Sequence, residues 1–394
     1  MELKEYRIKE IGKVVTGKTP STFDSENYGS DYLFITPAEL HDGYKIVDAE
    51  KRISVKGFNS IKSNTISGNS VLVGCIGWDM GNVGYTEETC ATNQQINSIC
   101  EFKSFCNPLY AYYWLSTKKK YLFSIASVTR TPLLSKSSFS EVFIPLPNRE
   151  YQDEVVKILS TINNKIQINK KIIAELESMA KEIYGYWFIQ FDFPNTNGTP
   201  YKASGGKMVW NKELGREIPD GWKVQKLTDY LVESTKSKIQ VNQVNDSVGN
   251  VPFFTSGNAI HYVNDYLVDD LNIFLSTGGN ASVQIYFGKA SYSTDTWCIN
   301  FSEYTSYMFI FIQSIIGYIN DNLFTGSGLK HLQKDKFGDI KIAIPPENVI
   351  NAFNKTVVNL FKMKAANMKS SRILNEQMNE LLPLLMNGQV SVKE

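Results

Sequence analysis

The chain has 394 residues, of which 42% are hydrophobic and 21% charged, and its formal net charge at neutral pH is +1. A chain of this length and apolar content can bury more than one core, which excludes intrinsic disorder and predicts two or three domains. A net charge so close to zero also excludes a uniformly basic nucleic-acid-binding surface, so any DNA-binding charge must be local.

The opening residues MELKEYRIKE carry acidic as well as basic side chains and lack the apolar core of a signal peptide. No apolar run approaches the length of about 18 residues that a membrane span needs. We therefore expect a cytoplasmic protein, and we expect no metal site because no C-x-x-C pair or histidine motif occurs. The cysteines are expected to be buried, reduced thiols: Cys75, Cys90, Cys100, Cys106 and Cys298.

The first predicted domain covers residues 1–146 and is rich in short strands. Runs such as DYLFITP and NSVLVGCIGW alternate apolar residues between turn-forming ones, which is typical of strands. The apolar run at residues 109–125 predicts a single buried helix. Residues 12–19, GKVVTGKT, formally match a phosphate-binding loop, but Pro20 and a polar loop follow where a helix should begin, so nucleotide binding is not expected.

Residues 147–190 predict the first of two long helices. Apolar residues recur there at alternating steps of four and three, and Asn169 is the polar member of this seam. Such a pattern is typical of a coiled coil. A helix of about 35 residues spans roughly 50 Å, a length suited to a spacer. The apolar seam residues are Val155, Leu159, Ile162, Ile166, Ile173, Leu176, Ala180, Ile183 and Trp187.

Residues 191–214 are rich in Gly, Pro, Asn and Lys and predict a linker to a second domain, residues 215–344. The second domain repeats the first, and its run at 306–323 predicts another single buried helix. The sequence comparison aligns Tyr6–Ile11 with Trp222–Leu227, Val71–Gly77 with Ile273–Gly279, and Ala91–Gln95 with Ser293–Trp297.

The end of each domain is also repeated, as FSEVFIPLPNREYQDEV at 139–155 and FGDIKIAIPPENVINAF at 337–353. A second long helix, residues 345–388, follows the second copy, and residues 389–394 form a tail. Asn367 matches Asn169 in the repeat. Because a seam asparagine can fix the register between helices, we predict that Asn169 and Asn367 pair; the alternative is a tolerated polar residue in each helix.

These elements predict an α+β protein with two strand-rich, pseudo-twofold-related domains on a two-helix rod. At this point the chain resembles the specificity subunit of Type I restriction-modification systems. The resemblance rests on GKTPS at 17–21, FITPAEL at 34–40, the helix at 152–188, the linker at 191–222 and the ending LNEQMNELLPLLMNGQVSV.

The resemblance implies two target-recognition domains joined by two antiparallel helices that form a coiled coil. Each domain would read one half of an asymmetric bipartite site in double-stranded DNA. The chain itself would be non-catalytic and hold no cofactor. Two methyltransferase subunits using S-adenosylmethionine, and restriction/translocase subunits using ATP and Mg, would supply adenine methylation and DNA cleavage.

Polar and basic loop residues are the expected DNA contacts, because such side chains read base edges and hold phosphates. Each of them also has an ordinary alternative as a solvated or turn-forming residue. In the first domain they are Lys18, Thr19, Ser21, Asn93, Gln94, Gln95, Thr129, Arg130, Thr131 and Lys136; in the second they are Lys236, Lys238, Asn280, Thr294, Asp295, Ser327, Lys330 and Lys334. Arg130 and Lys330 are favoured because VTRTPLLSK and GSGLKHLQK occupy the same place in the repeat.

Two other functions fit the sequence less well. A stand-alone adenine-specific DNA methyltransferase needs a loop of the form Asp/Asn-Pro-Pro-Phe/Tyr, and the chain offers Asn107-Pro108-Leu109-Tyr110, with Leu in place of the second Pro. Pro108 more simply begins a helix. A coiled-coil scaffold with two unrelated binding domains explains the seam but neither the repeated proline junctions nor the linker.

Overall fold

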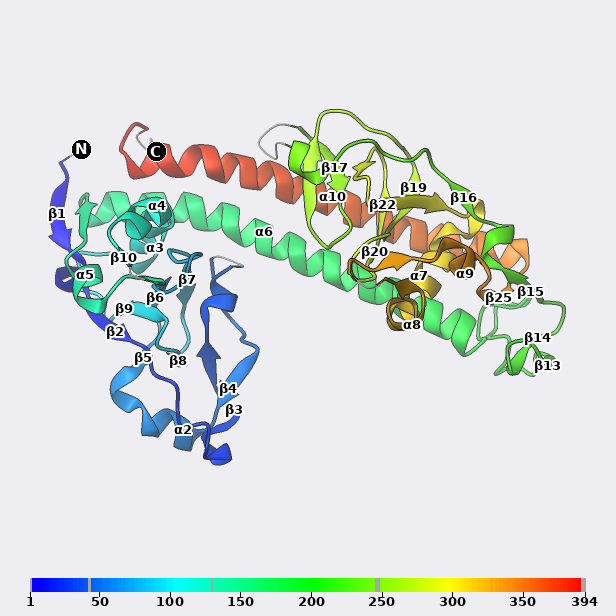
Figure 1. The fold of residues 1–394 in the computed structure, drawn as a ribbon, viewed down its shortest axis with the longest axis horizontal. Helices are drawn as coiled ribbons and strands as arrows, with labels where there is room; N and C mark the ends of the chain where they lie inside the picture. Colours follow the sequence, from blue (N-terminus) through cyan, green and yellow to red (C-terminus); the bar gives the residue numbers. More distant parts are fainter. Residues whose placement is uncertain (1, 42–43, 129, 245–248, 327, 391–394) are drawn as a thin grey trace. The chain divides into compact units, whose positions relative to one another are not determined.

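The computed structural model describes residues 2–41, 44–128, 130–244, 249–326 and 328–390. The chain divides into two compact units: unit 1 comprises Met1–Lys165 and Leu374–Glu394, and unit 2 comprises Ile166–Ile373. Both boundaries fall inside the long helices α6, Arg149–Tyr184, and α10, Glu347–Met386. Each unit therefore holds one globular domain and part of both long helices (Figure 1).

The globular part of unit 1 is built on two four-stranded sheets. The first has the order β2-β9-β6-β7, from β2 (Lys13–Thr16), β9 (Ile96–Cys100), β6 (Ser70–Gly74) and β7 (Val83–Thr86). The second has the order β4-β3-β8-β5, from β4 (Lys51–Ile53), β3 (Tyr28–Ile35), β8 (Cys90–Thr92) and β5 (Thr65–Ile66), with β3 and β8 parallel. Two antiparallel pairs complete the strands: β1 (Lys4–Arg7) with β12 (Phe143–Leu146), and β10 (Ser127–Val128) with β11 (Pro132–Leu133).

The α-helices of this part are α1 (Ile8–Ile11), α2 (Val55–Ser60), α3 (Pro108–Ser116), α4 (Lys119–Ser124) and α5 (Lys136–Ser140). Single 3₁₀ turns lie at Ser25–Asn27, Pro37–Leu40 and Lys62–Asn64. The buried rings of Tyr110 and Tyr113 in α3 join one core with Val71 of β6 and with Val155 and Leu159 of α6. Because that core also includes Met378 and Leu385, the end of α10 completes unit 1.

Unit 2 repeats this topology with a four-stranded sheet of order β16-β22-β19-β20 and a three-stranded sheet of order β18-β17-β21, in which β17 and β21 are parallel. The sheet strands are β16 (Val232–Glu233), β22 (Thr296–Asn300), β19 (Leu271–Ser276), β20 (Val283–Phe287), β18 (Ile260–Val263), β17 (Val251–Phe254) and β21 (Ser291–Tyr292). The remaining pairs are β13 (Met208–Asn211) with β14 (Arg216–Pro219), β15 (Lys223–Lys226) with β25 (Lys341–Ile344), and β23 (Phe324–Thr325) with β24 (His331–Leu332).

The helices of unit 2 outside the long pair are α7 (Thr305–Ser314), α8 (Ile316–Asn322) and α9 (Lys334–Gly338), with 3₁₀ turns at Leu227–Asp229, Val241–Gln243 and Ser302–Tyr304. The two single helices predicted from apolar runs are therefore each broken into two. In unit 1 the break follows Ser116, where the Thr117 hydroxyl donates to the carbonyl oxygen of Trp114 at 2.7 Å. The predicted linker is also more ordered than expected, since Phe191 and Phe193 are buried and pack on Trp222.

The internal duplication is confirmed, but its alignment shifts in two places. Ile8 corresponds to Leu227, because their backbone N–H groups donate to Val142 and Ile340 at the same point in each unit. Likewise Gln95 corresponds to Asp295, because their carbonyl oxygens accept from Cys75 and Thr277. The sequence alignment is therefore wrong by a few residues at both points, since short alternating strands offer several similar registers.

The long helices follow the predicted seam. α6 begins at Arg149, two residues after Pro147, and a π-helical turn, Gly185–Ile189, continues it. The seam residues of α6 and their repeats in α10 are all buried or half-buried. Within unit 2, Glu177 pairs with Lys364 and the ring of Trp187 lies 5.7 Å from that of Phe353, so α6 and α10 run antiparallel there.

The predicted pairing of Asn169 with Asn367 is wrong. The Asn169 side-chain amide donates to the hydroxyl of Ser370 at 3.0 Å, and the Asn367 amide donates to the carbonyl oxygen of Met363 in its own helix. In an antiparallel pair of repeated helices, equivalent residues lie opposite each other only where the pseudo-twofold axis passes between the helices. Asn169 lies beside that point, so its neighbour is Ser370 rather than Asn367.

Candidate nucleic-acid interface

In each unit, the predicted DNA-contacting loops gather at one end of the four-stranded sheet. In unit 1, the antiparallel register places Thr16, at the end of β2, opposite Asn97 in β9, and Gly74, at the end of β6, opposite Ile96. The loops after β2 and β6 and the turn before β9 therefore meet. In unit 2, Ser276 at the end of β19 lies opposite Thr296, so the equivalent loops meet in the same way.

In unit 1, side chains predicted to contact DNA join the loop after β2 to the turn before β9. The Thr19 hydroxyl donates to the Gln94 side-chain oxygen at 2.9 Å. Asn93 donates to the side chain of Gln95 at 2.9 Å and accepts from its backbone N–H at 3.0 Å. Asn93 and Gln95 are half-buried and stabilise the turn, whereas Gln94 is exposed. Within this turn, Gln94 is therefore the better placed residue for an outside ligand.

The loop after β6 connects this turn to the β10–β11 hairpin. The backbone N–H of Cys75 donates to Gln95 at 2.7 Å, and the carbonyl oxygen of Cys75 accepts from Leu134 at 2.9 Å. The N–H of Gly77 donates to Pro132 at 3.0 Å. Backbone hydrogen bonds thus tie three loops, distant in sequence, into one surface.

The cations of this surface are open to solvent. Lys18 and Arg130 are exposed, and within the described part of the chain no ion pair forms at either of them. Lys136 is exposed too, but it is the first residue of α5 and its charge acts on Cys100, at the other end of β9. Ser21 and Thr131 are exposed as well, while Thr129 lies outside the described residues. Uncompensated cations at the ends of loops are suited to contact phosphate oxygens.

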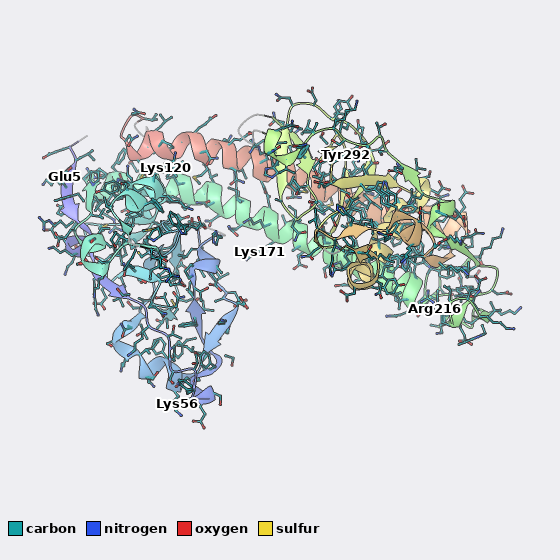
Figure 2. The ribbon with its side chains drawn as sticks, viewed as in Figure 1. Glu5, Lys56, Lys120, Lys171, Arg216 and Tyr292 are labelled. Carbon is teal, nitrogen blue, oxygen red and sulfur yellow. The ribbon has the colours of Figure 1, made fainter. Side chains whose placement is uncertain are left out.

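In unit 2 the same end of the sheet contains a pocket of about 310 Å³. Its lining includes Lys236, Thr294 and Lys334, together with Thr277 and His331, which the sequence does not single out. Tyr292, labelled in Figure 2, also lines it and donates its hydroxyl to the carbonyl oxygen of Thr235 at 2.5 Å. The structure therefore brings predicted residues from two loops and from the start of α9 together.

The predicted cations Lys236 and Lys334, which line this pocket, and Lys238, which does not, differ in their surroundings. Lys334 pairs with Glu233 at 2.6 Å, and its ammonium lies 4.1 Å from the ring centre of Trp297. Lys236 and Lys238 are exposed, and the backbone N–H of Thr294 donates to Ile239 at 3.0 Å, which holds their loop in place. The charge of Lys334 is thus partly neutralised within the unit.

The hairpin of unit 2 sits beside a second, polar pocket of about 540 Å³. Asn280 lines this pocket with Ser256–Asn258, and the backbone N–H of Gly279 donates to the carbonyl oxygen of Lys330 at 3.0 Å. Asn280 and Lys330 are both exposed, and Ser327 lies outside the described residues. Asn280 and Lys330 therefore belong to the same surface as the preceding pocket.

Asn107, the residues that match a phosphate-binding loop, and the cysteines all have structural roles. The Asn107 side chain accepts from the N–H of Leu109 at 2.9 Å and donates to Asp153 at 2.6 Å, so it caps α3 rather than binding a base. Residues 13–16 of the phosphate-loop match form strand β2. All cysteines are buried and unpaired, and burial raises the pKa of the Cys75 and Cys106 thiols to about 12.

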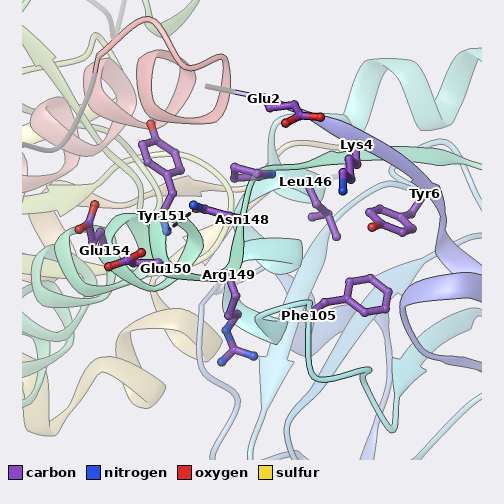
Figure 3. Close-up of a pocket in the computed structure, with 11 residues that line it drawn as sticks. Glu2, Lys4, Tyr6, Phe105, Leu146, Asn148, Arg149, Glu150, Tyr151 and Glu154 are labelled. Atoms are coloured by element: carbon purple, nitrogen blue, oxygen red, sulfur yellow. Dashed lines mark hydrogen bonds between the residues drawn. The ribbon is translucent and has the colours of Figure 1, made fainter.

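A further pocket of about 540 Å³ lies between β1 and the start of α6, where Tyr6 stacks on Phe105 (Figure 3). Its lining contains none of the predicted DNA contacts. Among the described residues, no group of three or more His, Cys, Asp or Glu could hold a metal ion. None of the helices in the described ranges is long and apolar enough to cross a bilayer.

Comparisons with known proteins match both halves of the chain to one family. A family model described as the Type I restriction modification DNA specificity domain matches residues 1–178 and 219–362. The Type I restriction enzyme MjaIX specificity subunit of Methanocaldococcus jannaschii is 27% identical over 419 residues, covering 98% of this chain and 93% of that protein. The HindI specificity subunit of Haemophilus influenzae is 35% identical over 172 residues, covering 42% of this chain and 37% of that protein.

The fold has a solved counterpart. The crystal structure of a Type I restriction-modification S subunit from M. genitalium superposes with a TM-score of 0.63 at 13% sequence identity, covering 98% of this chain and 96% of that one. At that identity the likeness concerns the fold alone. It supports two similar strand-rich units that share a pair of long helices.

Proposed function

The chain belongs to the Type I restriction modification DNA specificity family, and from this premise we propose that it is the DNA-recognition subunit of a Type I restriction-modification complex. Unit 1 reads one half of a bipartite site and unit 2 reads the other. The two half-sites differ in sequence because the equivalent loops carry different side chains.

The observation that carries this proposal is the repeated gathering of loops at the same end of the sheet in each unit. Lys18 and Arg130 in unit 1, and Lys236 and Lys330 in unit 2, are exposed in these loops. The same loop clusters carry side-chain amides such as those of Gln94 and Asn280, which match base edges. Local cationic loops account for DNA binding by a chain whose net charge is only +1.

The long helices are proposed to set the spacing between the half-sites. α6 has 36 residues and α10 has 40, which at about 1.5 Å per residue gives each a length of roughly 55–60 Å. A paired, continuous helix resists bending far better than a linker of similar length. Base pairs between the half-sites would then be spanned without being read.

The chemistry is proposed to reside in partner subunits. Two methyltransferase subunits would bind S-adenosylmethionine and methylate adenine, and restriction/translocase subunits would use ATP and Mg for cleavage. The capping role of Asn107 supports a non-catalytic chain. The segment most similar in sequence to an adenine methyltransferase loop uses this asparagine to cap α3.

Reconstitution tests this proposal directly. The full chain is combined with its methyltransferase partner, and transfer of labelled methyl groups from S-adenosylmethionine to host genomic DNA is measured. We expect transfer with both proteins and none with either alone. Transfer by this chain alone would establish it as an enzyme, and equal transfer by the partner alone would remove the proposed specificity role.

A further inference from the structure

Trp78 stands out among the residues of the unit 1 surface. It follows Gly77 in the loop after β6, its side chain is 70% exposed, and its ring lies 6.3 Å from that of Phe123. Single exposed apolar side chains are common on proteins, so exposure alone means little. Trp78 is distinguished by its position in the repeat.

That position is the same in unit 1 as the position of Asn280 in unit 2. The N–H of Gly77 donates to Pro132, and the N–H of Gly279 donates to Lys330, at 3.0 Å in both cases. Both glycines have positive φ values, +101° and +82°, which lets the loop turn in the same way before the next residue. The residue after each glycine is Trp78 in one unit and Asn280 in the other.

The charges around Trp78 suit the approach of DNA. The neighbouring carboxylate, Asp79, pairs with Lys119 at 2.5 Å and lies 3.2 Å from His41, so its repulsion of phosphates is reduced. The hairpin that holds the loop presents Arg130 and Thr131, both exposed. The loop that carries the exposed Trp78 is thus hydrogen-bonded to a hairpin with an exposed arginine, on the surface where a duplex is proposed to bind.

On the basis of the proposed function, we propose that positions 78 and 280 are equivalent base-reading positions: Trp78 contacts the methyl group of a thymine, and Asn280 contacts the edge of an adenine. In the major groove an apolar side chain recognises the thymine C5 methyl, whereas an asparagine amide pairs with the donor and acceptor of adenine. One loop position in a repeated fold thus reads a different base in each half-site.

Removal of single methyl groups from DNA tests the role of Trp78. The bipartite site is first obtained from the wild-type complex with its methyltransferase, and duplexes are then made in which each thymine in turn is replaced by deoxyuridine. For the wild-type complex, we expect one such replacement to weaken binding about four-fold, the effect of one buried methyl group. Trp78→Ala and Trp78→Asn should bind the thymine and deoxyuridine duplexes equally.

Asn280→Ala is the matched control and should keep the full deoxyuridine effect, because it changes the other half-site. The role of Trp78 is disproved if no thymine methyl matters to the wild-type complex, or if the effect persists undiminished in both Trp78 variants. Failure of the wild-type complex to bind any bipartite duplex would instead refute the proposed function. Both Trp78 variants replace an exposed side chain, and their melting temperatures are compared with that of the wild type.

Discussion

At the scale of single residues, the predicted contacts fall into two groups. Asn93 and Gln95 bond each other and shape a turn, and Lys334 is partly neutralised by Glu233. Arg130 and Lys330 instead project from the hairpins that close each loop cluster. Among the described residues, neither side chain of the second group forms an ion pair within the protein, so this group should contribute more to recognition.

Arg130→Ala should impair recognition of one half-site and leave the other unchanged. If Arg130 contacts a guanine edge, discrimination at one base pair should fall by about 1–3 kcal/mol; if it contacts phosphate, binding should weaken for all sequences alike. The measurement is methylation of a panel of single-base variants of the site. Arg130→Lys should rescue the phosphate role but not the guanine role, and Lys330→Ala should affect the opposite half-site.

A loss of folding in Arg130→Ala would contradict a role for Arg130 in DNA contact. An exposed side chain of this kind should change the free energy of unfolding by no more than about 0.5 kcal/mol. A melting temperature well below that of the wild type, with both half-sites affected equally, would show a structural role.

A second prediction concerns Lys364, a cation within the helix seam. Its side chain is 11% exposed, and its ammonium bonds Glu177 at 2.6 Å and the carbonyl oxygen of Ile285 at 3.4 Å. Glu177→Gln leaves this buried charge without a countercharge, so we expect the free energy of unfolding to fall by about 1–2 kcal/mol, less than for a fully buried pair. Lys364→Met removes the charge itself and should cost less.

Urea unfolding of the full-length variants measures the difference. If Lys364→Met destabilises the protein more than Glu177→Gln, the ion pair contributes net stability. Its attraction would then exceed the free-energy cost of removing the lysine charge from water. The double variant serves as the control, because it has neither partner and should resemble Lys364→Met.

At the scale of elements, the seam periodicity predicts the long helices to within two residues at either end when the π-helical turn Gly185–Ile189 is counted with α6. A repeated 3.5-residue pattern over many turns has few alternatives. The partner of Asn169 could not be obtained in this way. A seam position states which face of a helix is buried, but the residue opposite depends on how far the two helices slide past each other. Ser370 is recognised as that residue only from the three-dimensional packing.

Shortening both helices by one heptad tests whether they measure distance. Because Asn169 lies beside Ser370, deletion of residues 166–172 and 368–374 removes matched segments and keeps the seam in register. The loss of about 10 Å should shorten the unread spacer by about three base pairs and leave both half-sites intact. The spacer is measured by sequencing the methylated sites. Deletion of the heptad from α6 alone should disrupt pairing and serves as the control.

A changed half-site combined with an unchanged spacer would refute the role of the helices as a ruler. It would mean that the deletion reaches the loops of a recognition domain. Unchanged spacer and unchanged half-sites in a folded protein would show that the spacing is set elsewhere in the complex.

At the scale of the whole molecule, the duplication is the feature that the sequence reveals best. Matching proline junctions, seams and loop segments predict two similar units. Both have a four-stranded sheet of equivalent order and a second sheet built around an equivalent parallel pair; the second sheet has one strand fewer in unit 2. The contacts predicted from the sequence nevertheless include Asn280 and not Trp78, although the alignment pairs Gly77 with Gly279. The signal was the shared glycine before each residue, but a tryptophan after a strand is more often a core residue, and only its exposure identifies it as a surface residue.

We propose that this chain selects the DNA sequence at which a partner acts. Methylome sequencing tests this on a host that carries the chain with its methyltransferase partner, beside the same host lacking the chain. We expect a split, asymmetric motif bearing methyladenine that disappears when the chain is deleted. A methylation pattern that is unchanged by the deletion, while the partner is present and the chain is folded in the control host, would contradict it.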